Sequence, residues 1–237
     1  MDVTMSFEKT SSDSCILEFK SDVEGIATTY ANLYRRTLLQ STPCYSVAGL
    51  RCSANGKYAK NFFEILPGMT ASMVDINTTL YNAVFDIDSD DNVIIISIEL
   101  GGKTMLSDIT DKSKISVKYG TSVDSITLRS QDKVLTNVVG NNNITLDIFL
   151  KKGVGFSNRD VNLEALKTVV SDSEIKSWIV GDSQHRGVMN VSYHSDVRLG
   201  KQTIKMEVKS YQNNIESVID NCTKHILKNM NSFLETE

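Results

Sequence analysis

The chain has 237 residues, 41% of them hydrophobic and 23% charged, enough to bury a substantial core in one large domain or in two smaller ones. Its 25 Lys and Arg against 29 Asp and Glu give a net charge of −4, which argues against direct, sequence-independent binding to nucleic acid. A polar, acidic start and the lack of any run of about 18 apolar residues favour an untargeted, soluble cytoplasmic protein over a membrane protein.

The first 40 residues predict a β-hairpin and a helix. Apolar residues alternate at positions 3–7 and 15–19 with turn-forming residues between them, as in a hairpin. After Gly25 apolar residues recur every three or four positions, which indicates an amphipathic helix of about three turns that ends before Pro43 and that Thr28 or Thr29 can cap. Its apolar stripe includes Tyr30, Leu33, Tyr34 and Leu38, and its polar face carries Arg35 and Arg36.

The middle of the chain predicts mainly β-structure. A β-like run at 47–52 is followed by an apolar segment at 62–66 that breaks at Pro67, and helical spacing from Met69 to Leu80 indicates a second helix. Short apolar runs between 92 and 150, separated by Gly- and Asn-rich turns, predict an antiparallel or mixed sheet. A loop and a short helix follow at 153–175, and strands are expected at 175–180, 188–193 and 203–208.

The last predicted element is a helix of about six turns. Eight apolar residues between Ile215 and Leu234 form one stripe, and Asn213 and Glu216 are placed as a capping pair. A helix with such a face must bury it on its own domain or on a partner. Together with the first helix and its symmetry mates, it could form a four-helix contact in a dimer.

Residues 29–43, TYANLYRRTLLQSTP, resemble the T-L-G-N-A-L-R-R-x-L-L-S-S-x-P signature of bacterial RNA polymerase α subunits. The Asn, both Arg, both Leu and the Pro are in register. Further segments match in the family's order: 67–80 resembles x-G-V-x-E-D-I-x-E-I-x-L-N-L, 102–109 resembles G-x-V-T-A-x-D-I, and 153–156 resembles the G-R-G-Y turn. The strands near 191 and 203–208 and the final helix follow the end of the family's N-terminal region. Agreement in this order over nearly the whole chain indicates a divergent α subunit.

The resemblance implies an α+β fold in which residues 1–52 and 179–237 form a discontinuous dimerisation domain, a sheet with two long helices. Residues 53–178 would form an inserted, mainly β domain. It also implies an assembly scaffold for transcription: the chain dimerises and recruits the β-like and β′-like subunits of a DNA-directed RNA polymerase, without catalytic residues, cofactor, metal or membrane contact and with little or no DNA contact. Because the chain stops where that region stops, no DNA-binding C-terminal domain is expected. The expected location is the cytoplasm of a bacterium or of a virus-infected host, with an organelle as the alternative.

The resemblance assigns residues to two surfaces. The expected dimer interface comprises Tyr30, Leu33, Tyr34, Leu38, Ile226, Met230, Phe233 and Leu234. The expected contacts with the large subunits are Asn32, Arg35, Arg36, Met69, Met73, Gly153, Gly155 and Phe156, and Arg36 is expected to be the more buried of the two arginines. Three positions depart from the family: its Gly is Ala31, its acidic pair is Ala71–Ser72, and its G-R-G-Y arginine is Val154.

Two alternatives stay open. The chain could pair with a different small subunit, as α-like subunits of archaeal and eukaryotic polymerases do. It could instead be a small hydrolase or ligand-binding protein, whose only candidate site is the loop with Asp182, Ser183 and His185. The segment Gly153-x-Gly155 lacks the context of a phosphate-binding loop and predicts a tight turn. Four cysteines without a C-x-x-C pair and three histidines without a ligand spacing indicate a reducing compartment and no structural zinc.

Overall fold

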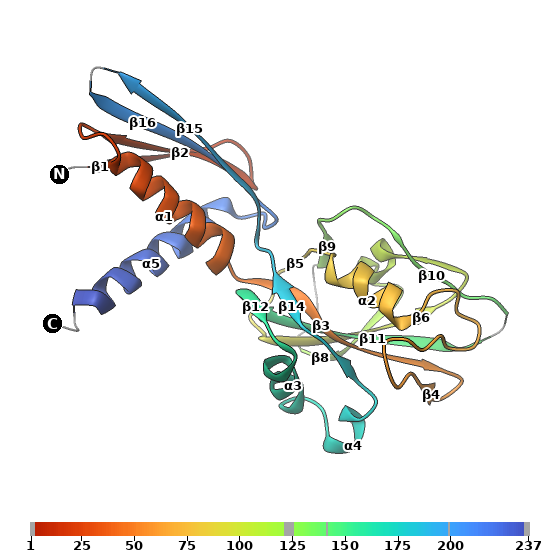
Figure 1. Cartoon of the computed structure of the whole chain (residues 1–237). Coiled ribbons are helices and arrows are strands. Elements are labelled where there is room, and N and C mark those ends of the chain that lie inside the picture. The colour runs from red at the N-terminus through yellow and green to blue at the C-terminus, as the bar shows by residue number, and fades with distance from the viewer. Residues whose placement is uncertain (1–2, 121–125, 141, 199, 235–237) are drawn as a thin grey trace. The chain divides into compact units, whose positions relative to one another are not determined.

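The chain folds into two compact units (Figure 1). The computed structural model describes residues 3–120, 126–140, 142–198 and 200–234, with side chains as far as Ser232. Met1–Pro43 and Arg186–Glu237 form one unit, here called the terminal unit, and Cys44–His185 form the other, the inserted unit. The predicted α+β class is therefore confirmed, with a sheet and two long helices built from both ends of the chain and a mainly β insert between them.

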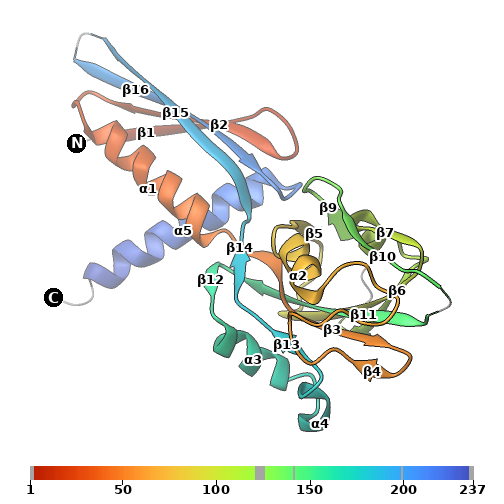
Figure 2. The ribbon, with the colours of Figure 1, turned by 45° about the vertical axis from the view of Figure 1, so that its right-hand side comes forward.

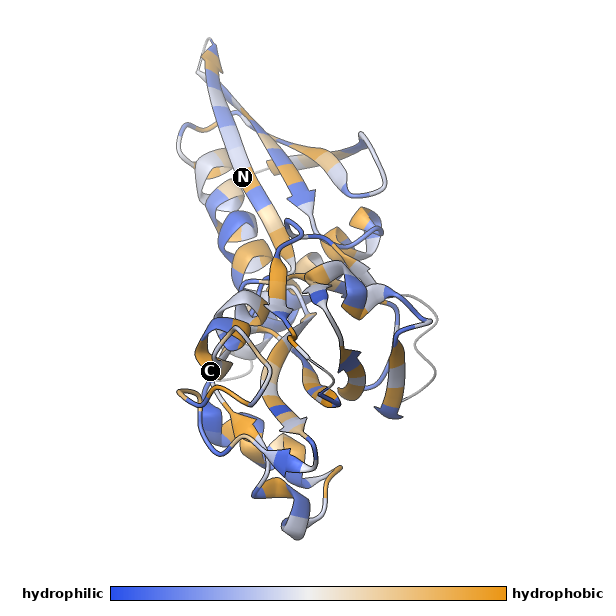
Figure 3. Ribbon diagram, turned by 90° about the vertical axis from the view of Figure 1, so that its right-hand side faces the viewer, coloured by the Kyte–Doolittle hydropathy of each residue, from blue (hydrophilic) through white to orange (hydrophobic). Residues whose placement is uncertain are grey.

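The terminal unit is a four-stranded antiparallel sheet with two helices on one face (Figures 1 and 2). The strand order is β1 (Val3–Lys9), β2 (Ser14–Ser21), β16 (Lys201–Ser210) and β15 (Val188–Arg198), and the helices are α1 (Ile26–Ser41) and α5 (Ile215–Leu234). Hydrophilic and hydrophobic residues alternate along the strands (Figure 3). Successive side chains of a strand point to opposite faces of the sheet. Every second residue, including Leu17, Phe19, Ile204 and Met206, therefore lies in a core that the sheet shares with the helices.

The two helices pack against each other and cross (Figures 1 and 2). The Gln212 side chain donates a hydrogen bond to Pro43 O, which brings the end of α1 to the start of α5. Farther along, the Tyr34 hydroxyl and Thr223 Oγ1 are 3.1 Å apart, and Cys222 Sγ donates to Tyr34 O over 3.9 Å. The Tyr34 ring also stacks at a tilt on Phe19, with 5.2 Å between ring centroids. Tyr34 thus joins the sheet and both helices.

The helix starts differ from the predicted caps. Gly25 adopts a left-handed backbone with φ of 87°, so α1 begins at Ile26, and Thr29 donates its hydroxyl back to Gly25 O instead of capping the helix. At α5 the cap is Asn214, whose Oδ1 accepts from Ser217 N at 3.1 Å, and not Asn213. The predictions failed because several polar residues in a row can cap, and only the path of the chain selects one.

The inserted unit is built on an eight-stranded sheet of antiparallel pairs with helices on both faces. Its strand order is β8 (Ile115–Tyr119), β6 (Val93–Leu100), β11 (Ile144–Gly153), β3 (Cys44–Ala54), β5 (Phe85–Ile87) and β9 (Ile126–Leu128), with β4 (Lys57–Tyr58) and β13 (Ile179–Val180) also paired to β3. Two short ribbons pair β7 (Lys103–Met105) with β10 (Val134–Asn137) and β12 (Gly155–Ser157) with β14 (Ser183–His185). A 3-10 helix, η1, covers Leu106–Thr110.

The helix α2 (Met73–Tyr81) packs its buried residues into the larger core of the inserted unit, while α3 (Arg159–Lys167) covers the other face of the sheet and leads to α4 (Asp172–Ile175) (Figure 2). The predicted start of α2 at Met69 was wrong. A capping box fixes the start at Met73: Asp75 N donates to Ser72 Oγ at 3.3 Å, and Ser72 N donates to Asp75 Oδ2 at 3.0 Å. The strand predicted at 175–180 is limited to β13, because residues 172–175 are helical.

A buried charge cluster joins three strands of the large sheet. Asp147 on β11 is 3% exposed, and its carboxylate accepts from Arg51 Nε on β3 at 2.7 Å and from Lys118 Nζ on β8 at 2.6 Å. The Arg51 guanidinium lies over the rings of Trp178 and Tyr58, 5.1 and 5.6 Å from their centroids. Hydrogen bonds and cation–π contacts therefore compensate these charges within the sheet.

Candidate protein interaction surfaces

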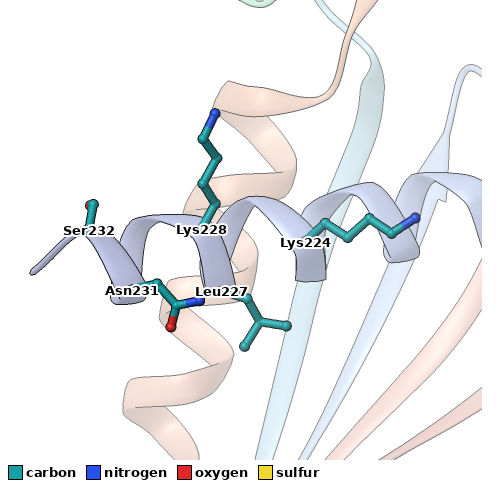
Figure 4. A pocket seen from close by; sticks show the side chains of 5 residues that line it. All are labelled: Lys224, Leu227, Lys228, Asn231 and Ser232. Atoms are coloured by element: carbon teal, nitrogen blue, oxygen red, sulfur yellow. The ribbon is translucent and has the colours of Figure 1, made fainter. Parts of the chain in front are cut away.

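A shallow, open pocket lies along α5, and it does not enclose a ligand site. It is lined by Lys224, Leu227, Lys228, Asn231 and Ser232, all from one helix, and Figure 4 shows Lys228 pointing to one side of the helix while Leu227 and Asn231 point to the other. Among the residues with described positions, no three His, Cys, Asp or Glu side chains gather as metal ligands. No helix of the described chain is long and apolar enough to cross a membrane.

The four cysteine side chains are buried. Burial raises the pKa of the Cys15 thiol to about 11 and those of Cys52 and Cys222 to about 12. The pKa of Cys52 is raised further by the nearby Asp147 carboxylate. These three side chains are therefore neutral, inert thiols at physiological pH, because the thiolate is the reactive form.

Both α1 and α5 carry exposed apolar side chains near the contact between Tyr34 and Thr223. Tyr30 and Leu33 on α1 and Leu227 and Met230 on α5 are all exposed. Tyr30 lies one turn before Tyr34, and Leu227 lies one turn after Thr223, the residue that Tyr34 contacts. All four residues lie within about two helical turns of that contact. We call these four residues the helix-pair surface.

The other residues predicted for a dimer interface lie elsewhere. Tyr34, Leu38 and Ile226 are buried in the core of the terminal unit, where they hold α1 and α5 on the sheet. The side chains of Phe233 and Leu234 lie outside the described residues. The helix-pair surface thus contains Tyr30, Leu33 and Met230 from the prediction.

Two of the three residues predicted to contact large subunits on α1 lie against β15, whereas Arg36 follows Leu33 by three positions and is its neighbour on the helix surface. Arg35 Nε donates to Val191 O on β15 at 3.3 Å, and Asn32 Oδ1 accepts from the hydroxyl of Tyr193, also on β15, at 3.3 Å. Arg36 makes no hydrogen bond or ion pair with any residue that the structure describes. Both arginines are exposed. Adjacent helix positions differ by about 100°, which directs Arg35 toward β15 and Arg36 outward.

The predicted contact residues of the inserted unit fall into two groups. Met69 and Met73 are in its core, so a contact made by α2 would use the exposed side that carries Asp75 and Thr78. The segment 153–156 forms a bend between β11 and β12, as predicted, with φ of 60° at Gly155. Phe156 points outward and is exposed.

Gly153 has a packing role that its sequence context does not reveal. A Cβ at this position would lie 2.6 Å from Nε2 of His185, closer than atoms of neighbouring groups approach. Only glycine therefore allows β11 to pass the buried imidazole. The resemblance assigned Gly153 to a subunit contact, whereas inside this unit its visible role is to make room for His185.

The loop at 182–185 does not assemble a hydrolytic site. Asp182 Oδ1 accepts from Arg159 N at 2.8 Å at the start of α3, whereas Ser183 and His185 are buried on the neighbouring strand. His185 Nδ1 is 3.0 Å from Cys44 O and 3.1 Å from Ser46 Oγ, and its Nε2 is 3.4 Å from Ser183 Oγ. Among the described residues no carboxylate bonds to the imidazole, which is only 2% exposed, so this geometry is that of a structural hydrogen-bond network.

This network predicts a pH-dependent stability of the inserted unit. Burial lowers the pKa of His185, the hydrogen bond with Cys44 O opposes that shift, and the nearby positive charge of Lys151 adds to it. An unfolded histidine has a pKa of about 6.5. As the pH falls below that value, the unfolded state therefore takes up a proton before the folded state does, and the free energy of unfolding decreases.

The measurement is unfolding in urea at pH 7.5 and pH 5.5, followed by the fluorescence of Trp178, the single tryptophan of the chain, which lies in the inserted unit. We expect the wild type to lose stability at the lower pH and the variant His185→Gln to lose clearly less. The other histidines, His194 and His225, are present in both proteins and cancel. Equal pH dependence of the two proteins would contradict the argument.

Comparison with known proteins adds a second line of observation. No protein-family profile matches the chain. Two proteins named DNA-directed RNA polymerase subunit alpha are similar to it: that of Mesoplasma florum is 28% identical over 182 residues, and that of Cytophaga hutchinsonii is 25% identical over 180 residues. Each alignment covers 75% of this chain, and 51% and 48% of the respective relative.

The chain is a distant homologue of the RNA polymerase α subunit. It spans about half the length of the curated relatives that it matches.

In this α-subunit homologue, sequence reasoning missed one exposed apolar residue of the helix pair. Leu227 follows Ile226 directly, and two adjacent apolar residues lie about 100° apart on a helix, so only one of them can lie in the centre of the stripe. Ile226 is buried and Leu227 is exposed. The sequence signal for Leu227 was that the apolar stripe of α5 is wider at residues 226 and 227 than elsewhere. A wider apolar stripe indicates that the helix contacts more than one neighbour.

Proposed function

We propose that the chain is an assembly subunit of a multisubunit DNA-directed RNA polymerase, which dimerises through the helix-pair surface and recruits two large catalytic subunits. In this role it carries no catalytic residue and supplies the architecture on which the large subunits meet. The observation that carries the proposal is the homology to α subunits combined with the position of the exposed apolar residues. They lie on the two long helices of the terminal unit, which the resemblance assigns to dimerisation.

The helix-pair surface supports a symmetric contact on physical grounds. It combines an aromatic, two leucines and a methionine on two packed helices, a composition typical of the central part of protein interfaces. A twofold axis through such a surface would bring four helices together, so that each copy covers the apolar residues of the other. The surrounding residues of α5, such as Lys224 and Lys228, are polar and fit the rim of an interface.

Two measurements test the proposal. Light scattering on the purified chain alone should give twice the mass of one chain, whereas a monomer that gains mass only with a different small polymerase subunit would favour a heterodimer. Co-expression with the two largest RNA polymerase subunits of the source organism should yield a complex that stays together during purification. If neither large subunit binds at micromolar concentration, the proposal fails.

Arg36→Ala is expected to weaken binding of a large subunit by about 10-fold or more while leaving the dimer mass unchanged. The side chain is exposed and makes no bond within the described chain, so its removal should not affect folding, and an arginine can form a forked pair with a carboxylate of a partner. Arg159→Ala is the matched control, because Arg159 is an exposed arginine on α3. Loss of the dimer in Arg36→Ala would show that the two faces of α1 are exchanged.

A further inference from the structure

The most exposed large apolar side chain of the described chain is Phe63, which is 85% exposed. It belongs to the segment between β4 and α2 in the inserted unit. Two further apolar residues are exposed nearby. Ile65 is on the same segment, and Val139 is on a neighbouring segment, where its N–H donates to Gly68 O at 2.8 Å. We call these three residues the Phe63 surface.

The segment that presents Phe63 is held in place by hydrogen bonds. Asn61 Oδ1 accepts from Phe63 N at 2.9 Å, and Glu64 Oε2 accepts from Lys60 N at 2.7 Å. Met73 N, at the start of α2, donates to Glu64 O at 3.1 Å. Phe62 packs against the core of the unit, while its neighbour Phe63 points outward. The exposed position of Phe63 is therefore imposed by a preorganised loop, which lowers the entropy lost when a partner binds.

Three lysines and the Glu64 carboxylate lie on or next to the segments that carry the Phe63 surface. Lys57 and Lys60 flank the segment, and Lys103 is near Val139, because Val138 N donates to Gly102 O at 2.7 Å. These three lysines are exposed and form no ion pair with any residue in the described parts of the chain. The chain as a whole has a net charge of −4, whereas these three lysines outnumber the one glutamate, Glu64, on the Phe63 segment. A partner that fits would offer an apolar pocket with acidic residues at its rim.

We propose that Phe63 anchors the inserted unit on an acidic-rimmed apolar pocket of a large polymerase subunit. This inference rests on the proposed function and adds to it a specific residue, a second contact region and the chemistry of the partner surface. A protein partner is favoured over nucleic acid because two of the three apolar residues are aliphatic and cannot stack on bases. Aromatic side chains held in rigid surroundings are typical of residues that dominate binding energy.

The test uses the full chain co-expressed with the two largest RNA polymerase subunits of its source. Phe63→Asp should weaken binding of a large subunit by about 100-fold, because an aspartate would meet an apolar pocket with an acidic rim. The dimer mass and the urea unfolding curve should equal those of the wild type, because the side chain is exposed. Val161→Asp, which changes another exposed apolar residue of the inserted unit, on α3, is the matched control and should bind normally.

The outcomes separate the two levels of the argument. If the wild type binds a large subunit and Phe63→Asp binds equally well, this inference is overturned and the proposed function stands. If the wild type binds neither large subunit, the proposed function fails and this inference fails with it.

The double variant Lys57→Glu, Lys60→Glu gives a second measurement, which should show about 10-fold weaker binding and a loss of salt dependence. Fluorescence anisotropy with a labelled 20-nucleotide single strand checks the other class of partner, and binding that Phe63→Asp abolishes would overturn the assignment to protein.

Discussion

Leu33→Asp should convert a dimer of this chain into a monomer. Leu33 is 39% exposed on α1 within the helix-pair surface, so the monomer can accept an aspartate there, whereas a symmetric contact would bury two of these charges without a partner. We expect the dissociation constant of the dimer to increase by about 100-fold or more, a loss of about 2.7 kcal/mol or more, which is the range of a residue in the centre of an interface. Light scattering over a dilution series from 100 to 1 μM measures the shift.

The same helix offers a matched control for that substitution. Leu39 is 41% exposed, and six positions along a helix place it about 120° around the axis from Leu33. Leu39→Asp therefore introduces the same charge with the same exposure on a different face and should leave the dimer mass unchanged. A dimer that survives Leu33→Asp and dissociates in Leu39→Asp would place the symmetric contact on the other side of α1.

The largest loss of stability is expected from Asp147→Ala in the inserted unit. The substitution removes the carboxylate that accepts from Arg51 and Lys118 and leaves the Arg51 side chain, which is 11% exposed, with only the exposed Glu174 as an ionic partner. Breaking a buried ion pair in this way typically costs about 3 to 5 kcal/mol, a large part of the free energy of unfolding of a domain this size. Urea unfolding followed by the fluorescence of Trp178 measures the loss.

Glu174→Ala is the control for Asp147→Ala. Glu174 contacts the same arginine, with 3.4 Å between its Oε1 and Arg51 NH1, but it is exposed and its pair is screened by solvent. Its removal should change the unfolding curve within experimental error. Equal losses in the two variants would mean that solvent reaches the cluster and that burial of Asp147 does not set its contribution.

Asp147 also gives the cluster a pH dependence of known sign. Burial by itself raises the pKa of the Asp147 carboxyl, but hydrogen bonds from Lys118, Ser97 and Arg51 outweigh it and lower the pKa below its usual value. Asp147 therefore contributes stability above the unfolded pKa of about 3.9, and this contribution is lost as the pH falls through the folded pKa. The effect of Asp147→Ala should accordingly shrink at strongly acidic pH, well below the range in which His185 acts.

The sequence predicted the elements of the terminal unit because they follow simple periods. Alternation defined the first hairpin, and helical spacing defined α1 and α5 to within a few residues, since both elements bury one face on a sheet. It could not tell which residues of those stripes are buried in the same chain and which are left for a partner. Tyr30 and Tyr34 are the same residue type and belong to the same apolar stripe. Only the structure distinguishes them, because Tyr34 is buried in contact with Phe19 and Thr223 whereas Tyr30 is exposed.

The features that sequence reasoning missed depend on contacts between distant segments. Asp147, Arg51 and Lys118 are far apart in the chain and meet only because β8, β6, β11 and β3 lie in that order in the sheet. Phe63 belongs to the apolar segment at 62–66, whose composition does not show that the turn at Asn61 directs Phe62 inward and Phe63 outward. Gly153 matched a family turn, while its packing against His185 needed coordinates.

The chain enters and leaves each unit at adjacent residues, and this closeness affects how the protein can evolve. In the inserted unit the first and last residues are adjacent, since His185 Nδ1 is 3.0 Å from Cys44 O. In the terminal unit the flanking residues are equally close, because a Cβ at Gly187 would lie 2.6 Å from the Thr42 side chain. A segment whose ends meet can be lengthened, exchanged or removed without separating the residues on either side of it. The insert is thus a module that evolution or an engineer can replace while α1, α5 and their sheet keep every contact described above.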